Sequence, residues 1–151
     1  MRGLERKHGY TLVEILIVVS TLGLLSVVAI PSYISSRASI LANEVADNYR
    51  TYAMAFKSYA AEHGSWPAKA GIGVPPPGME GRLPRFDSES PIGGTWDWEC
   101  GQPDLKAGIS LVNCKPNPAV LKRIDRMLDD GNLATGQIYV RDNRLTLVLE
   151  R

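Results

Sequence analysis

One acidic residue stands at the edge of a long uncharged segment. Glu14 directly precedes residues 15–36, a run of 22 residues without a charged side chain. A carboxylate at the boundary of an apolar layer is costly, so its presence there favours a functional role. The alternative is that Glu14 simply lies in the headgroup zone of a membrane.

Few other residues could carry chemistry. His8 and His63 are the only histidines, and the sequence contains no nucleophile elbow, phosphate-binding loop or metal-binding helix motif. Asp129-Asp130-Gly131-Asn132 has the composition of a calcium loop, but it lacks the alternating oxygen ligands and the closing glutamate. We therefore expect no enzyme active site, no cofactor and no metal site.

The uncharged segment is long enough to cross a membrane. As a helix it would span about 33 Å, which exceeds the ~30 Å of a bilayer core. A buried core helix rarely runs so long without a charge. A secretory signal has a shorter apolar core and a small-residue cleavage site, which residues 26–29 match poorly. Because residues 1–9 carry a net charge of +2, the positive-inside rule predicts a cytoplasmic start and an external remainder.

Cys100 and Cys114 are the only cysteines. Outside the cytoplasm disulfides persist, so we expect the two to form a bridge that closes a loop of about 15 residues and contributes about 3 kcal/mol. Two free thiols are the alternative. A structural zinc site usually needs four ligands. Beyond the basic first nine residues, the chain offers only the two cysteines and His63.

The residues around Glu14 form a specific pattern. A basic leader ends in Gly9, and Tyr10, Thr-Leu-Val-Glu and the apolar segment follow it. This pattern resembles the prepilin signature of type IV pilins and type II secretion pseudopilins, over about residues 3–36. Tyr10 stands where the family more often has phenylalanine.

The resemblance implies a processing route and an assembly role. Gly9 would be the last leader residue, cut by a prepilin peptidase, and Tyr10 would become an N-methylated N-terminus. Glu14 would pair with the terminal amine of a neighbouring subunit and set its axial register, since a buried charge needs a counter-charge. Gly23 and Pro31 fall where pilins commonly have them, near the part of the helix that loosens. A proline inside a helix removes a hydrogen bond and kinks the axis.

The helical pattern continues beyond the uncharged segment. No proline or glycine interrupts residues 32–63, and Gly64 and Pro67 follow as stop signals. We predict one helix over residues 11–63, apolar all round in its first half and amphipathic in its second. Its apolar stripe comprises Leu41, Val45, Tyr49, Tyr52, Phe56, Tyr59 and His63.

The remaining residues predict a small sheet that covers this stripe. Residues 64–94 are dense in glycine and proline and predict a long irregular loop, either a variable surface connection or a subunit contact. Asn117 and Pro118 can start a short helix that Gly131 would stop. Alternating apolar runs predict strands at 95–99, 109–112, 137–141 and 145–149, with a hairpin turn at 142–144.

The expected fold class is therefore α+β and pilin-like. One long N-terminal helix, whose first half spans a membrane, packs on a small antiparallel sheet. The expected organisation is a leader (1–9), a transmembrane and assembly half of the helix (10–36), an amphipathic half (37–63) and a globular head (64–151).

Charge and the resemblance together define the expected function. With 17 basic and 16 acidic residues the chain carries a net charge of +1, which argues against general nucleic-acid binding. The resemblance implies a structural subunit of a type IV pilus-like filament or a type II secretion pseudopilus. It would enter the bacterial inner membrane in a single pass, with the N-terminus cytoplasmic and the head periplasmic or extracellular.

The expected partners follow from the same resemblance. They are the prepilin peptidase and N-methyltransferase, other pilin or pseudopilin subunits, and the inner-membrane assembly platform. Two alternatives remain open. One is a minor pilin that acts as a membrane-anchored binding module for DNA or a secreted substrate. The other is a secreted enzyme with an ordinary signal peptide.

Overall fold

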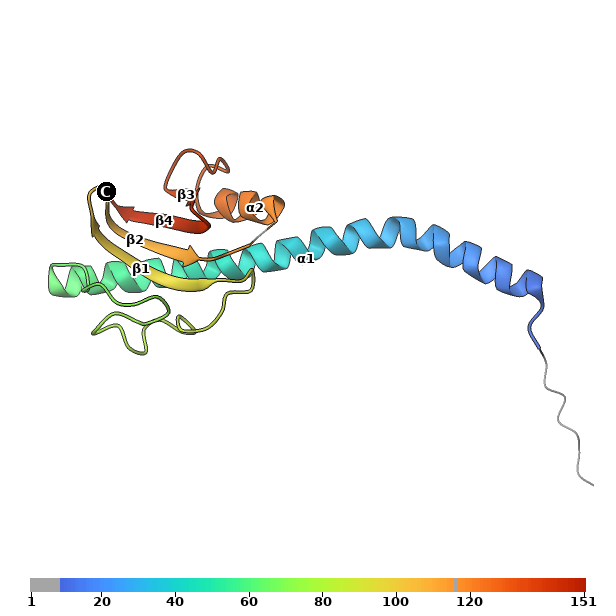
Figure 1. The fold of residues 1–151 in the computed structure, drawn as a ribbon, viewed down its shortest axis with the longest axis horizontal. Coiled ribbons are helices and arrows are strands. Elements are labelled where there is room, and N and C mark those ends of the chain that lie inside the picture. Colours follow the sequence, from blue (N-terminus) through green and yellow to red (C-terminus); the bar gives the residue numbers. More distant parts are fainter. Residues whose placement is uncertain (1–8, 116) are drawn as a thin grey trace, which may run out of the picture. The chain divides into compact units, whose positions relative to one another are not determined.

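The structure is a computed structural model that describes residues 9–115 and 117–151. The basic residues of the expected leader and His8 lie outside the described residues. The chain divides into two units: the first ends at Arg37, and the second begins at Ala38. The long helix α1 (Leu12–His63) contributes residues to both units. The second unit also contains β1 (Thr95–Gln102), β2 (Leu105–Val112), α2 (Pro118–Leu128), β3 (Ile138–Arg141) and β4 (Arg144–Glu150) (Figure 1).

The predicted long helix is confirmed, with Pro31 inside it. In the second unit α1 is amphipathic and buries one face, formed by Ala42, Val45, Ala46, Tyr49, Tyr52 and Phe56. The helix ends because Gly64 adopts a φ of 71° and donates its N–H to the Ala60 carbonyl at 2.9 Å. His63 was predicted to belong to the apolar stripe but is exposed. Its ring stacks on the ring of Tyr59.

The predicted antiparallel sheet is also confirmed. It has four strands in the order β1-β2-β4-β3. β1 and β2 are longer than predicted because they form one hairpin, in which Gln102 pairs with Leu105 across a two-residue turn. The hairpin between β3 and β4 turns at Asp142 and Asn143, whose positive φ angles of 50° and 59° suit the twist of the strands.

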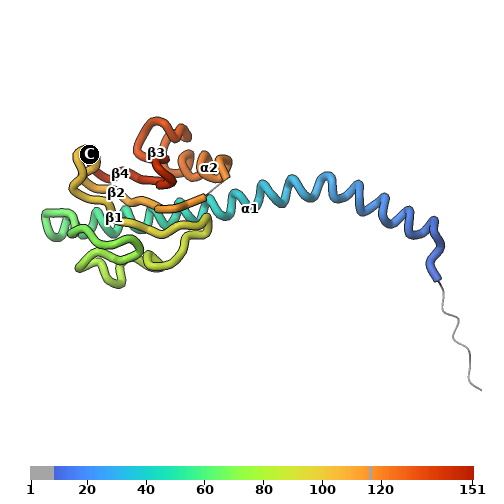
Figure 2. Tube along the Cα trace, in the orientation of Figure 1, coloured from blue at the N-terminus to red at the C-terminus, as the bar shows by residue number. Residues whose placement is uncertain are grey.

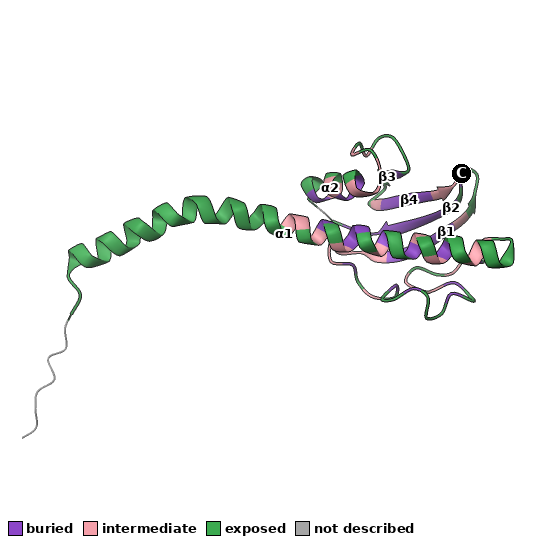
Figure 3. Cartoon of the chain, turned by 180° about the vertical axis from the view of Figure 1, so that it is seen from behind, coloured by how far each residue is buried: buried purple, intermediate pink, exposed green. Residues whose placement is uncertain are grey.

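Aromatic side chains join the sheet to α1. Trp96 and Trp98 alternate with polar residues along β1 and lie on the same buried face. The Tyr49 ring meets the Trp96 ring edge-on at 4.9 Å between centroids, and Phe56 stacks on Trp98 at 3.8 Å. Figure 3 shows the buried residues gathered in the strands and on the second half of α1. Burial of these large rings is the main source of stability in the second unit.

The loop of residues 64–94 contributes to the core. It contains no helix or strand, as predicted, and its course from α1 to β1 can be followed in Figure 2. Met79, Leu83 and Phe86 of this loop are nevertheless buried, and Phe86 meets Tyr52 edge-on at 5.3 Å. The Tyr52 hydroxyl donates to the Pro84 carbonyl at 2.7 Å. The loop is therefore a packed part of the second unit, and a purely surface connection is excluded for these residues.

The short helix α2 begins as predicted and ends earlier than predicted. Asn117 caps it, because its side-chain oxygen accepts the N–H of Ala119 at 2.9 Å. The helix ends at Leu128, and Asp129 follows as its C-cap residue. Gly131, the expected stop, lies in the loop beyond, with a φ of 83°.

The expected disulfide between Cys100 and Cys114 is wrong for this structure, where both thiols are free. The strand register supplies the reason. Cys100 pairs with Ala107 at one end of the β1–β2 hairpin, whereas Cys114 follows Val112 at the other end. At about 3.3 Å per residue these ends are about 17 Å apart, and a disulfide needs Cα atoms within about 7 Å.

Candidate functional site

The first candidate site is the part of α1 that belongs to the first unit. Every described residue from Gly9 to Arg37 is exposed, including the large apolar side chains between Tyr10 and Ile34 (Figure 3). By its length and composition α1 is able to cross a membrane. A continuous apolar surface of this size marks a contact with lipid or with other proteins.

Polar side chains within this segment bind their own helix. The Ser20 and Ser26 hydroxyls donate to the carbonyls of Leu16 and Leu22, each at 2.7 Å. Thr21 donates to the Val18 carbonyl at 2.9 Å. Because these hydroxyls are satisfied internally, the helix surface can enter an apolar environment without leaving them unpaired.

Glu14 forms a capping box with Thr11 at the start of α1. The Glu14 Oε2 atom accepts the Thr11 N–H at 2.7 Å and the Thr11 hydroxyl at 2.9 Å. The Thr11 Oγ1 atom in turn accepts the Glu14 N–H at 3.2 Å. Thr-x-x-Glu before an apolar run is the sequence signature of this cap, a role of Glu14 that was not predicted above. Glu14 thus stabilises the start of its own helix through contacts within the chain.

Gly9 and Tyr10 lie immediately before this cap and are open to solvent. Tyr10 is 83% exposed, and a Cβ placed on Gly9 would meet nothing within 4 Å. A Cβ on Gly23 would likewise meet nothing within 4 Å. Packing against the described part of the chain therefore requires neither glycine.

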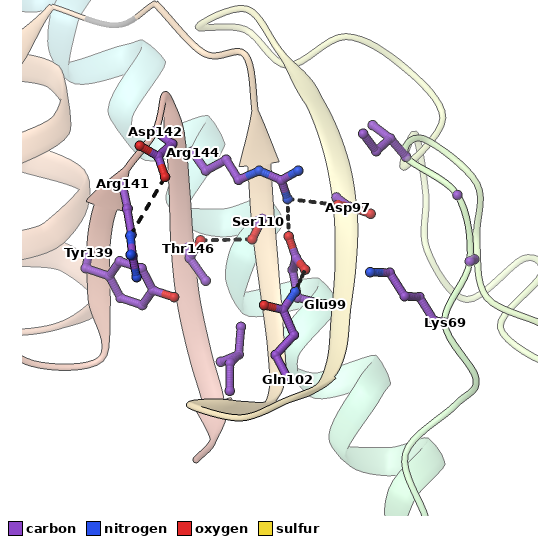
Figure 4. Close-up of a pocket in the computed structure, with 14 residues that line it drawn as sticks. Lys69, Asp97, Glu99, Gln102, Ser110, Tyr139, Arg141, Asp142, Arg144 and Thr146 are labelled. Carbon is purple, nitrogen blue, oxygen red and sulfur yellow. Dashed lines mark hydrogen bonds and ion pairs between the residues drawn. The ribbon is translucent and has the colours of Figure 1, made fainter.

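A second candidate site is a polar groove of about 620 Å³ on the face of the sheet that the tryptophans do not occupy (Figure 4). Its centre is Arg144 on β4, whose Nη1 lies 3.2 Å from Asp97 Oδ2 and also contacts Glu99. Ser110 and Thr146 share a hydrogen bond of 2.9 Å across β2 and β4. These groups come from three neighbouring strands.

The charges in this groove are mostly compensated within the chain. Burial raises the pKa of Asp97, the nearby Glu99 raises it further, and Arg144 opposes both effects. Among the described residues no group hydrogen-bonds Asp97 Oδ1. Arg144 already serves two carboxylates, Arg141 pairs with Asp142 at 3.8 Å, and the described residues that line the groove include no cysteine or histidine. It is best explained as an internal ion cluster that stabilises the outer face of the sheet.

Comparison with known proteins gives two relatives. Over 79 residues the chain is 32% identical to two sequences described as type IV major pilin protein PilE1 of Neisseria gonorrhoeae. The match covers 50% of this chain and 48% and 44% of those two sequences. The chain thus spans about half the length of the curated relatives it matches. No family model and no solved structure matches the chain.

Proposed function

We propose that this chain, a relative of the type IV pilins, is a structural subunit of a membrane-anchored filament rather than an enzyme. The observation that carries the proposal is the exposed apolar helix surface that begins directly after one capped carboxylate, in a chain similar to major pilins. Such a surface is unstable in water and requires either lipid or an equally apolar bundle of helices. Filament assembly is then the transfer of this surface from lipid to neighbouring subunits.

Processing would expose a new amine next to the cap. In this proposal a prepilin peptidase removes residues 1–9 on the cytoplasmic side of the inner membrane, and an N-methyltransferase modifies the amine of Tyr10. The exposure of Gly9 and Tyr10 supports access by both activities. The second unit would lie in the periplasm or beyond, and an inner-membrane platform would add the subunit to the filament.

The capping box suggests how Glu14 could serve two partners. Both donors of Thr11 bind the same carboxylate oxygen, Oε2. A carboxylate can accept about four hydrogen bonds, so Oε1 retains capacity for the Tyr10 amine of a neighbouring subunit. The pair would fix the axial register of the incoming subunit, since a misplaced subunit would leave both charges unpaired in an apolar bundle. Gly23 and Pro31 would allow α1 to loosen locally during this packing.

We propose a pilus subunit over a pseudopilus subunit because both relatives are described as major pilins. A role as a binding module for DNA or a secreted substrate has no comparable support. The groove on the sheet pairs its charges internally and presents no surplus of basic groups.

The test separates the charge of Glu14 from its capping role. Glu14→Gln keeps a side chain that can close the capping box but removes the charge, whereas Thr11→Val removes the capping hydroxyl and keeps the charge. We expect Glu14→Gln to be processed normally and to be absent from sheared surface filaments. Thr11→Val should be processed and should still assemble, because its helix start loses only about 1 kcal/mol. N-terminal mass spectrometry of the membrane and sheared fractions reads both steps.

Each alternative has its own result. Wild-type filaments should begin with methylated Tyr10. The same end confined to the cell envelope would indicate a pseudopilus or minor subunit instead. An N-terminus elsewhere would exclude prepilin processing. Wild-type filament yield from Glu14→Gln would exclude the register role of the carboxylate.

A further inference from the structure

A row of polar side chains crosses all four strands on the outer face of the sheet. Asp97 on β1 pairs with Ser110 on β2, which also pairs with Thr146 on β4. Thr146 in turn pairs with Tyr139 on β3. Side chains of residues paired in this way lie on the same face of a sheet. The row forms the floor of the polar groove of about 620 Å³, and Figure 4 shows its members side by side.

The floor of this groove is deeply buried although it lies on the outer face of the sheet. Asp97, Ser110 and Thr146 are 4%, 0% and 3% exposed. Residues 69–72 of the loop line the groove beside β1, and Tyr139 lies at the other end of the row (Figure 4). The volume of the groove is within the range of small-molecule binding sites.

The ion cluster around Arg144 leaves two polar groups of the floor without partners. Asp97 Oδ2 contacts Arg144, but Asp97 Oδ1 accepts no hydrogen bond from any described residue. Ser110 and Thr146 share one hydrogen bond, although each hydroxyl has a hydrogen to donate. One hydroxyl hydrogen of this pair therefore has no acceptor among the described residues. A free acceptor and a free donor thus lie side by side at a buried position, where unpaired polar groups are costly.

The acidic side chains of the floor are already held in place. Arg144 Nη1 lies 3.2 Å from Asp97 Oδ2 and also contacts Glu99. Gln102 Nε2 donates to Glu99 Oε2 at 2.6 Å. Side chains that are fixed before binding lose little conformational entropy when a ligand arrives.

The charges that line the groove are balanced, which favours a neutral ligand. The lining residues include three basic and three acidic side chains, namely Lys69, Arg141, Arg144, Asp97, Glu99 and Asp142. An anion would lie against the buried carboxylates of the floor. A cation would lie close to Lys69, whose charge already acts on Asp97. A neutral ligand with groups that both donate and accept hydrogen bonds avoids both conflicts.

We propose that this groove binds a carbohydrate. A hydroxyl group is both a donor and an acceptor. One sugar hydroxyl can therefore donate to Asp97 Oδ1 and accept the free hydrogen of the Ser110–Thr146 pair. The ring face of Tyr139 offers an apolar surface on which the C–H groups of a sugar ring can pack. This binding role is separate from filament assembly and does not depend on it.

Saturation-transfer difference NMR on the full-length protein tests the proposal. The probes are maltose, lactose, cellobiose and N,N′-diacetylchitobiose, offered separately at millimolar concentration. The micelles consist of a zwitterionic detergent, because maltoside and glucoside detergents would compete for the groove. We expect at least one probe to receive saturation and to bind with a dissociation constant of about 1 mM or below.

Variants of the floor locate the bound sugar. Asp97→Asn should weaken binding at least about tenfold, because hydrogen bonds to a charged acceptor contribute more than neutral ones. The double variant Ser110→Ala, Thr146→Val should weaken binding at least about threefold. It removes both partners of one hydrogen bond, so it leaves no new unpaired group in the floor. Thr51→Val, at an exposed threonine of α1 outside the groove, is the matched control and should bind like the wild type.

A variant at the edge of the groove keeps the test independent of changes in the floor. Tyr139 is half-buried, so Tyr139→Ala should remain folded by circular dichroism and should also weaken binding. Tyr139→Phe keeps the ring and should bind like the wild type. If none of the four probes receives saturation, the groove holds only water and the proposal is wrong. Unchanged affinity in Asp97→Asn and in Tyr139→Ala would place the sugar elsewhere and would equally refute it.

Discussion

Arg144 determines the electrostatics of the outer sheet face. Its guanidinium contacts both Asp97 and Glu99, which are 4% and 5% exposed. One guanidinium therefore serves two buried carboxylates, and Lys69, which also lines the groove, opposes the rise in the pKa of Asp97 as Arg144 does. Because burial and Glu99 raise the pKa of Asp97 against the influence of Arg144, the folded protein holds the Asp97 proton more tightly than the unfolded chain does.

This pKa shift predicts a pH effect. As pH rises above about 4, the usual pKa of aspartate, the unfolded chain loses the Asp97 proton before the folded protein does. The free energy of unfolding of the wild type should therefore fall, relative to Asp97→Asn, until pH passes the raised pKa. Urea unfolding followed by tryptophan fluorescence between pH 4 and pH 7 measures the difference. Parallel pH profiles would contradict the prediction.

Replacing Gly94 by alanine should strongly lower the stability of the second unit. Its φ is 88°, and a Cβ there would lie 2.5 Å from the Val112 carbonyl oxygen. We expect Gly94→Ala to lower the free energy of unfolding by at least about 3 kcal/mol, from left-handed strain together with displacement of the adjacent backbone. Gly81→Ala is the matched control, because the φ of Gly81 is 76° and a Cβ added there would meet no other described residue within 4 Å. Gly81→Ala should lower the free energy of unfolding by about 1 kcal/mol, measured by urea unfolding. Equal losses in the two variants would show that the close approach to the Val112 carbonyl oxygen is unimportant.

The register of the β1–β2 hairpin determines whether the two cysteines can form a disulfide. Once Thr95 pairs with Val112, Cys100 and Cys114 are held at opposite ends of the hairpin. Cys114 is buried, with its Sγ 3.5 Å from the Asn143 carbonyl oxygen, and burial raises the pKa of its thiol. Cys100 is only partly buried. The two thiols therefore differ in reactivity.

We predict that both cysteines stay reduced in protein isolated from the cell envelope. Alkylation of the unfolded protein without a reductant should add two labels, read by mass spectrometry. In the folded protein Cys100 should react well before Cys114, because a buried thiol with a raised pKa forms little thiolate. A mass lower by two hydrogens with no label would instead require a different pairing of β1 and β2.

The two units have different physical requirements. The second unit has its own core, which includes α1 residues from Ala42 onward, residues of all four strands and of α2, and part of the loop over residues 64–94. The first unit consists of exposed residues wherever it is described. Folding of the second unit and burial of the first are therefore separate events, one within the chain and one that needs lipid or other subunits.

A fragment of residues 37–151 should consequently fold alone. We expect it to be soluble without detergent and to unfold cooperatively in urea, with a midpoint close to that of the full chain in detergent. Circular dichroism and tryptophan fluorescence provide the two probes. A fragment without a cooperative transition would show that the second unit depends on the apolar half of α1.

Patterns within a few residues of one another could be interpreted without a structure. The uncharged run after Glu14 and the spacing of Gly9, Tyr10 and Glu14 led to the resemblance with type IV pilins. The stripe from Val45 to Phe56 predicted the long amphipathic helix, and the turn at 142–144 predicted a hairpin. These features depend on local periodicity and on the residue types of turns, which can be recognised from residues close together in the sequence.

Contacts between distant segments could not be deduced in this way. Arg144 meets Asp97 across 47 residues, the loop at Phe86 enters the core, and the β1–β2 register separates Cys100 from Cys114. Each depends on which strands pair, in which register, and on which side chains fill the space beside α1. Those choices minimise the free energy of the whole second unit, so no short stretch of sequence contains them.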